Sequence, residues 1–273
     1  MTSFHIDHTI TDGIERIVYR PEKPRYKTPL LMQHGMWHGA WYWQPWQQLL
    51  AIWGWESHAF SLPGHGKSPE QRSIRWCTLD YYLEFLATEV QRLPQPPVIL
   101  GHSMGGALTQ RYLKKKGDLP AAVLVASWPS KSILPDFLEW MPRDPLGLVL
   151  ALLTLTAAPG VRSAERAADL LITENALLTP AELHSRLGPE SLWVLLQHQP
   201  PFWSPPLRTR TPLLWVAGTH DRATSEAHHR ASATSYSADY VVLEGAGHNL
   251  MLDKKSPEAA RAVHDWLVEQ GIE

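Results

Sequence analysis

A serine stands between glycines at the point where an apolar run ends and an amphipathic run begins. The segment GHSMGG, residues 101–106, directly follows PVIL and precedes ALTQRYLKK. This order predicts a sharp strand-to-helix turn that presents the Ser103 hydroxyl as a nucleophile. Side chains at positions 101 and 105 would collide with the backbone that closes around such a turn, which explains the two glycines.

The pattern G-x-S-x-G arises by chance in about one chain in ten of this length, so the surrounding elements have to support it. Short apolar or β-branched runs bounded by glycine and proline predict eight strands. The later runs are continuously apolar, as in parallel strands covered by helices on both faces, whereas the first two predict an antiparallel edge hairpin. The predicted strands are His5–Ile10, Ile14–Tyr19, Leu30–His34, Ser57–Ser61, Val98–Leu100, Ala121–Ala126, Leu213–Ala217 and Tyr240–Leu243.

Helical patterns separate these runs, for example over Leu79–Leu93. The last helix has Ser256 as its predicted N-cap, Pro257 at its first position and Gly271 as its stop. Alternating strands and helices predict an α/β fold with a doubly wound, mostly parallel eight-stranded sheet.

Residues 129–210 interrupt this alternation, with many helix formers and prolines but no credible strand. We expect them to form a helical cap inserted into an α/β core made of residues 1–128 and 211–273. The Leu-rich stretch 146–155 predicts either an apolar acyl or aromatic pocket or, equally, a seal between cap and core. Four aromatic residues of the cap support the same two alternatives: Phe137, Trp140, Trp193 and Trp203.

Two residues complete a catalytic triad in the chain order Ser, Asp, His. His248 follows the glycine-containing loop EGAG and precedes the last helix, so its imidazole can reach the serine as a base. Asp221 ends LLWVAGTHD, in a loop at the carboxyl end of a buried strand, where open α/β sheets place their sites. A turn or cap role is the alternative for Asp221.

The other histidines are interpreted as surface or packing residues. His228 and His229 are expected on an exposed helix, and His58 on a strand.

An oxyanion hole needs two backbone N–H groups aimed at the developing negative charge. Met104, directly after the nucleophile, supplies the first. The loop QHGMW, residues 33–37, is expected to supply the second from Met36, with Gly35 permitting a tight turn. Trp37 and Trp128 adjoin the predicted catalytic loops and are the predicted pocket walls.

Over essentially its whole length the chain resembles the serine-nucleophile branch of the α/β-hydrolase superfamily. The segment HGMWHGAW, residues 34–41, is similar to a signature of the esterase and hydroxynitrile lyase group. Lyases of that group carry threonine at the position of Gly35 and lysine at that of Asn249, so both departures favour ester hydrolysis. The segment SLPGHGKS, residues 61–68, matches the family's DLPGHGxS turn except for Ser61.

The resemblance implies a serine hydrolase that cleaves a carboxylic ester of a small, largely apolar substrate through an acyl-enzyme intermediate. Thioesterases and lactonases share the serine and remain alternatives, as does a hydrolase-fold ligand receptor with little turnover. Dehalogenases and epoxide hydrolases of the superfamily use a nucleophilic aspartate, so Ser103 argues against both.

Composition limits the partners. With 25 basic and 27 acidic residues, the net charge of -2 shows no electrostatic footprint for nucleic acid or anionic lipid. The single cysteine, Cys77, excludes an intrachain disulfide and a thiolate-rich metal site. We therefore expect a small-molecule ester as partner, with no cofactor and no metal.

Two stretches of the sequence bear on where in the cell the protein is located. Residues 1–30 lack the apolar core of a signal peptide, which predicts a cytoplasmic protein. The longest apolar stretch, residues 147–158, is too short for the roughly 20 residues that span a bilayer.

Overall fold

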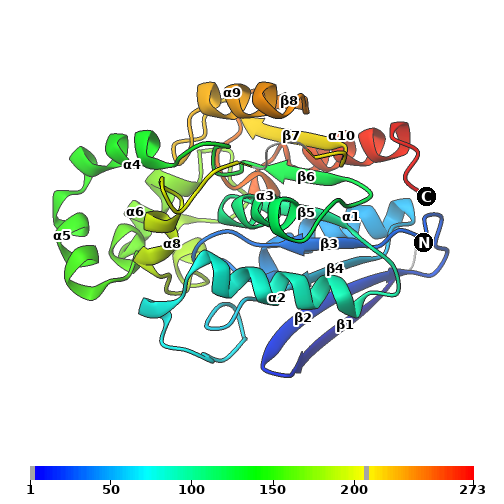
Figure 1. Cartoon of the computed structure of the whole chain (residues 1–273), viewed down its shortest axis with the longest axis horizontal. Helices are drawn as coiled ribbons and strands as arrows, with labels where there is room; N and C mark the ends of the chain where they lie inside the picture. Colours follow the sequence, from blue (N-terminus) through cyan, green and yellow to red (C-terminus); the bar gives the residue numbers. More distant parts are fainter. Residues whose placement is uncertain (1–3, 206–208) are drawn as a thin grey trace.

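Eight strands form one sheet in the computed structural model, which describes residues 4–205 and 209–273 (Figure 1). The strand order is β1-β2-β4-β3-β5-β6-β7-β8. The strands are β1 Phe4–Thr11, β2 Ile14–Pro21, β3 Leu30–Gln33, β4 Ser57–Phe60, β5 Val98–His102, β6 Ala122–Val125, β7 Leu213–Gly218 and β8 Asp239–Leu243.

The direction of each strand follows the predicted pattern. β1 and β2 form an antiparallel hairpin, and β2 pairs antiparallel with β4. Every pairing from β4 through β3 to β8 is parallel, and every residue of β3, β5, β6 and β7 is buried. Continuous apolar runs suit strands that are covered on both faces. The predicted α/β fold with a mostly parallel eight-stranded sheet is confirmed.

Helices cover both faces of the sheet. In the view of Figure 1, α2 and α3 lie in front of the strands and α1 and α10 behind them. The α-helices are α1 Gln44–Trp53, α2 Leu79–Arg92, α3 Met104–Lys115, α4 Leu134–Trp140, α5 Pro145–Thr154, α6 Ala164–Leu171, α7 Pro180–His184, α8 Leu192–Gln197, α9 Glu226–Tyr236 and α10 Ser256–Glu269. Short 3-10 helices are η1 Ala40–Trp43, η2 Ile74–Trp76, η3 Met141–Arg143, η4 Ala158–Val161 and η5 Leu250–Leu252.

The start of the last helix differs from the prediction. α10 begins at Ser256 itself, and no side chain caps it. The Ser256 hydroxyl instead accepts a hydrogen bond from the buried Trp46 indole at 3.1 Å. A buried indole N–H needs a hydrogen-bond acceptor. The Ser256 hydroxyl is that acceptor for Trp46 and therefore does not cap the helix in the way that the sequence pattern predicts. Gly271 follows the helix with φ 69°, as a stop signal predicts.

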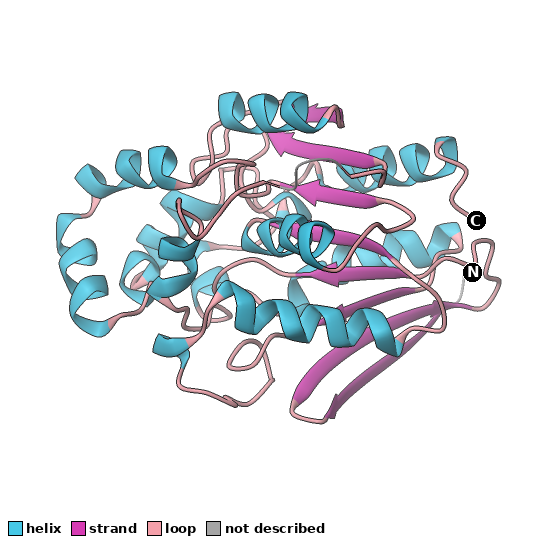
Figure 2. Cartoon of the chain, viewed as in Figure 1, coloured by secondary structure: helices cyan, strands magenta, loops and turns pink. Residues whose placement is uncertain are grey.

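Helices α4 to α8 lie together beyond the carboxyl ends of the parallel strands, on the side to which the arrowheads point in Figure 2. None of the eight sheet strands comes from the described residues between β6 and β7. The bounds 129–210 for a separate cap remain a prediction; residues 206–208 of that range and 1–3 of the first core segment lie outside the described residues. Within 4–205 and 209–273, no helix is both long and apolar enough to cross a membrane.

Candidate active site

Ser103 occupies a strained turn between β5 and α3. Its backbone has φ 54° and ψ -119°, a conformation that is costly for any residue other than glycine. Hydrogen bonds on both sides maintain it: Ser103 N–H donates to the Val125 carbonyl at 3.0 Å, and Trp128 N–H donates to the Ser103 carbonyl at 3.2 Å. The strand-to-helix turn that the sequence predicts is therefore present, and the neighbouring strand β6 holds it.

Asp221 and His248 meet at the same edge of the sheet. Asp221 lies in the loop after β7 and His248 in the loop after β8, and His248 Nδ1 donates to Asp221 Oδ2 at 2.8 Å. The other carboxylate oxygen, Oδ1, accepts the N–H groups of Ala223 at 2.8 Å and Thr224 at 3.0 Å. Both Asp221 and His248 are buried.

Asp221 stays ionised in this environment. Burial by itself raises the pKa of Asp221, but the adjacent His248 and the hydrogen bonds from two histidines outweigh it, so the pKa lies below its usual range. An ionised carboxylate that contacts Nδ1 leaves His248 Nε2 free to act as a base.

His102, the residue before Ser103, contacts His248. The His102 ring lies 4.8 Å from the His248 ring, measured between centroids, and His102 Nε2 donates to the His248 carbonyl at 3.2 Å. Within residues 4–205 and 209–273, the Ser103 hydroxyl has no hydrogen-bond partner. The structure therefore brings Asp221 and His248 into contact, whereas Ser103 and His248 share the sheet edge without a direct hydrogen bond.

Two N–H groups are available for an oxyanion. Met104 is the first residue of α3 and Met36 follows β3, and both residues are buried. In the described part of the chain, neither of these N–H groups donates to another residue. Free buried donors of this kind are what an oxyanion hole requires.

Gly35 brings the Met36 loop against the nucleophile. A Cβ atom at position 35 would lie 2.7 Å from Ser103 Cβ and 2.9 Å from His102 Nδ1. Gly35 is not among the residues with positive φ, whereas Trp37 has φ 63°. The close approach of the two loops therefore requires glycine at position 35, whereas the φ angle of Gly35 does not.

The expectation that His229 lies on an exposed face is also wrong. His229 lies on α9 and is fully buried, and its Nε2 lies 3.1 Å from Asp221 Oδ2. The burial of Ser232 and Ala233, three and four residues later, marks the inner face of the helix. Their small side chains were the only signal of this face in the sequence. His228 points elsewhere and pairs with Asp136 at 2.8 Å.

Asn249 ties the His248 loop to the Met36 loop. Its side-chain amide donates to His38 Nε2 at 3.1 Å, and His38 Nδ1 donates to the Met36 carbonyl at 2.6 Å. Its carbonyl oxygen accepts from the Tyr42 hydroxyl at 3.3 Å. Burial lowers the pKa of His38 to about 3, so its ring is neutral and can accept as well as donate.

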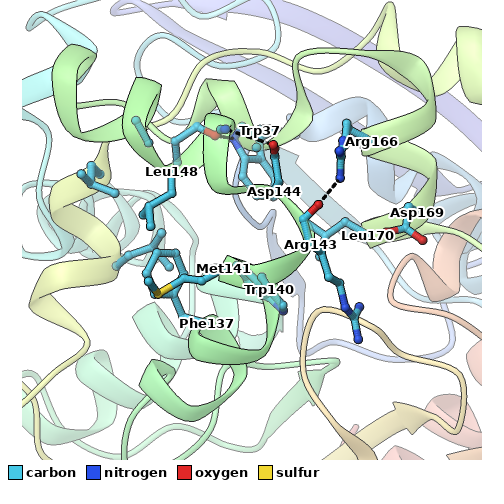
Figure 3. Close-up of a pocket in the computed structure, with 16 residues that line it drawn as sticks. Trp37, Phe137, Trp140, Met141, Arg143, Asp144, Leu148, Arg166, Asp169 and Leu170 are labelled. Atoms are coloured by element: carbon cyan, nitrogen blue, oxygen red, sulfur yellow. Dashed lines mark hydrogen bonds between the residues drawn. The ribbon is translucent and has the colours of Figure 1, made fainter.

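A partly open pocket with a cavity volume of about 100 Å³ lies among α4, α5, α6 and α8 (Figure 3). Its lining is mostly apolar and includes Phe137 and Trp140. Trp37 is the lining residue from outside the predicted cap, and its indole donates to the Ala157 carbonyl at 3.2 Å. Trp37 directly follows Met36 in the chain, and it is the residue of the lining that lies nearest in sequence to the candidate oxyanion hole; Met36, Met104 and the three triad candidates do not line the cavity.

The other predicted tryptophans lie outside this lining. Trp128 is buried and meets the His198 ring edge-on, with 5.1 Å between ring centroids. Trp203 is buried and donates to the Ser130 carbonyl at 2.9 Å, while Trp193 is partly exposed. In residues 4–205 and 209–273, no group of three or more His, Cys, Asp or Glu side chains could hold a metal ion.

Comparisons with known structures agree with this architecture. A thermophilic esterase is 21% identical with a TM-score of 0.67, over 99% of this chain and 100% of its own. A monoacylglycerol lipase from Paleococcus ferrophilus is 22% identical with a TM-score of 0.70, over 94% of this chain and 99% of its own. An N-acyl homoserine lactonase is 17% identical with a TM-score of 0.71, over 97% of each chain. At these identities the likeness concerns the fold.

Sequence comparison gives the family. The chain has no significant match among curated protein sequences. A model described as the alpha/beta hydrolase family matches residues 30–263, which include the Met36 loop, the Ser103 turn and both Asp221 and His248. The chain therefore belongs to the alpha/beta hydrolase family.

Proposed function

We propose that this protein is a serine hydrolase that cleaves a carboxylic ester of a small, largely apolar substrate. The observation that carries the proposal is the 2.8 Å hydrogen bond between His248 Nδ1 and Asp221 Oδ2, at the sheet edge where Ser103 occupies its strained turn. A buried carboxylate, an oriented imidazole and a serine on such a turn are the components of nucleophilic acyl transfer.

Acylation begins when the Ser103 hydroxyl oxygen attacks the acyl carbon and His248 Nε2 takes the hydroxyl proton. The N–H groups of Met36 and Met104 stabilise the oxyanion, and the alcohol leaves with the proton that His248 returns. Water then attacks the acyl-enzyme, giving its proton to His248, and the acid leaves as Ser103 regains that proton. Asp221 holds the imidazole in one tautomer and stabilises the imidazolium that forms in each step.

Two positions favour ester hydrolysis over lyase chemistry. Position 35 has no room for the threonine of the lyases, because a Cβ there would meet Ser103 Cβ at 2.7 Å. Asn249, which stands where those lyases have lysine, is buried and bonded to His38 and Tyr42. It therefore supplies no cation to the site.

The substrate preference follows from the cavity beside Trp37. An apolar lining with few polar atoms favours an aliphatic or aromatic acyl group over a charged one. Among the similar structures are an esterase, a lipase and a lactonase, and all three names refer to acyl-oxygen chemistry. A thioesterase domain is also among the similar structures, so lactones and thioesters are both alternative substrates.

The test compares the wild type with Ser103→Ala on p-nitrophenyl esters of two to ten acyl carbons. We expect kcat to fall by about three orders of magnitude or more, leaving the catalysis that binding and the oxyanion donors provide. A fluorophosphonate should label the peptide that contains Ser103. The control Ser73→Ala, at an exposed position, should keep both activity and labelling.

Three outcomes separate the alternatives. Steady turnover of oxygen esters with loss in Ser103→Ala supports the proposal. A higher kcat/KM for matched lactones or thioesters than for oxygen esters would mean that the same mechanism acts on those substrates. A single slow acylation without further turnover indicates a ligand receptor, and full activity of Ser103→Ala rejects the nucleophile.

A further inference from the structure

One oxygen of Asp221 accepts hydrogen bonds from two histidines. Asp221 Oδ2 lies 2.8 Å from His248 Nδ1 and 3.1 Å from His229 Nε2. His248 belongs to the triad, whereas His229 comes from α9 and is fully buried. His229 has no place in the mechanism described above, although it is in direct contact with the acid.

The protonation state of His229 follows from its other neighbour. The indole of Trp215, on β7, donates to His229 Nδ1 at 3.1 Å. An indole N–H only donates, so His229 Nδ1 must be an unprotonated acceptor. The ring proton then sits on Nε2 and points at Asp221. His229 therefore accepts from Trp215 through Nδ1 and donates to Asp221 through Nε2.

We propose that His229 is a positioning residue of the hydrolytic site, which fixes the Asp221 carboxylate in the orientation that receives His248. The inference rests on the proposed function. Two backbone N–H groups, from Ala223 and Thr224, donate to Oδ1, and without His229 only His248 would donate to Oδ2. Trp215 donates to His229 and His229 donates to Asp221, so the two donors form a chain from the sheet core to the carboxylate of the triad.

His229 also affects the charge that His248 experiences. A second donor on Oδ2 takes up part of the carboxylate's negative charge, so the imidazolium is held less tightly than by an unshared carboxylate. Glu226, at the start of α9, is a titratable neighbour of His229, and it accepts a hydrogen bond from the Tyr240 hydroxyl at 2.9 Å. Neither contacts Asp221 Oδ2 directly.

The experiment compares His229→Leu, which removes the donor, with His229→Gln, whose side-chain amide can donate from nearly the same place. The chain offers a matched control: Trp55 donates to His264 Nδ1 at 3.0 Å, and His264 on α10 packs against Tyr26 and Trp53. His264→Leu therefore removes the same kind of Trp–His bond away from the triad. Each variant is assayed for kcat, KM, pH profile and urea stability.

We expect His229→Leu to lower kcat by about 10- to 100-fold, the range seen when a partner that orients a ligand is removed. KM should stay within about twofold, since uniform substrate binding is unchanged. The acidic limb of kcat/KM against pH should move to higher pH, because the unshared carboxylate retains the imidazolium longer. His229→Gln should recover most of the kcat, and His264→Leu should change stability alone.

The ring nitrogens give a readout that does not need activity. Nitrogen-15 spectra of histidine-labelled protein should show His229 protonated on Nε2 and not on Nδ1 from pH 5 to 9. Trp215→Phe should remove this restriction and give an intermediate loss of kcat, which keeps the test valid if His229→Leu fails to fold.

Two results would overturn the inference. The first is a kcat for His229→Leu equal to that of His264→Leu at similar stability. The second is a proton on His229 Nδ1 in the wild type. If Ser103→Ala abolishes turnover while His229→Leu is unaffected, only this inference fails; if the wild type hydrolyses no ester, thioester or lactone, the proposed function fails with it.

Discussion

The carboxylate of Glu15 accepts a hydrogen bond from the Ser61 hydroxyl at 2.7 Å, and both side chains are buried. The same oxygen accepts the Lys67 N–H at 2.8 Å. Ser61 stands where the turn that this chain resembles has an aspartate, and Glu15 on β2 supplies the carboxylate instead. The turn thus keeps its buried acceptor although the acid comes from another strand.

This relationship predicts the effect of restoring the aspartate. Ser61→Asp would place two carboxylates side by side in a buried site, and we expect it to lower the free energy of unfolding at pH 7 by about 3 kcal/mol, as for other unpaired buried charges. The loss should shrink as the pH falls toward 5, because one proton shared by the pair removes the repulsion. Urea unfolding at both pH values measures it.

The double variant Glu15→Gln, Ser61→Asp is the control, since it leaves one carboxylate in the site. Its stability should recover by more than half of the loss. If Ser61→Asp were as stable as the wild type at pH 7, Glu15 would not occupy the aspartate's role.

Local pattern predicted the buried strands β3, β5, β6 and β7 because each is a short, largely apolar run with glycine or proline close to its ends. The sheet order did not follow from pattern, since it depends on which strands pair across distances such as that from β3 to β5. Likewise, the Glu15–Ser61 bond joins residues that are 46 positions apart, and no local rule relates them.

The candidate site, like the sheet, could be predicted only in part from local sequence. Chain order and loop position singled out Asp221 and His248, which the structure joins. His229 was missed because two adjacent histidines on a helix look alike in sequence, while packing on Trp215 turns only the second one inward. Gly35 was identified, but its reason lies in the Ser103 Cβ that opposes it, 68 positions away along the printed sequence.

Gly35→Ala tests the close approach of the Met36 loop. The added methyl group would meet Ser103 Cβ at 2.7 Å, so the loop must move and take the Met36 N–H with it. We expect kcat to fall by about 100-fold, the effect of losing one oxyanion donor. The control is Gly188→Ala, whose Cβ would have no neighbour nearer than 3.8 Å and which should keep the wild-type kcat. Equal activities in the two variants would contradict the role of this loop.

Filling the cavity tests whether it receives the acyl chain. Ala151 on α5 is buried and lines the cavity, so Ala151→Trp should shorten the chain that fits. We expect kcat/KM for a decanoyl ester to fall by about tenfold or more, as several methylenes lose burial at about 0.8 kcal/mol each, while acetyl ester hydrolysis changes little. Leu153→Trp, two positions along the same helix and 76% exposed, is the control. A uniform loss for all chain lengths would place the acyl group elsewhere.

The ion pair between Asp80 on α2 and Arg111 on α3 makes the free energy of unfolding depend on pH in the acid range. Hydrogen bonds from Arg111, acting against partial burial and helped by Lys115, lower the pKa of Asp80 to about 2. The carboxylate receives Arg111 Nε at 2.8 Å and Nη2 at 2.7 Å, so the contact is bidentate. A lowered pKa in the folded state means that the contribution is present above the ordinary value near 4 and disappears as the pH falls toward 2.

Asp80→Asn should therefore lower the free energy of unfolding at pH 7 by about 1 kcal/mol or less, because nearly half of the Asp80 side chain is exposed and solvent screens the pair. Wild type and variant should converge in urea unfolding between pH 4 and pH 2. Asp12→Asn, which breaks the more exposed pair with Arg92, should change stability little at any pH. A difference between wild type and Asp80→Asn as large at pH 2 as at pH 7 would mean that the side chain acts through packing, since most of the contribution of the charge is lost by then.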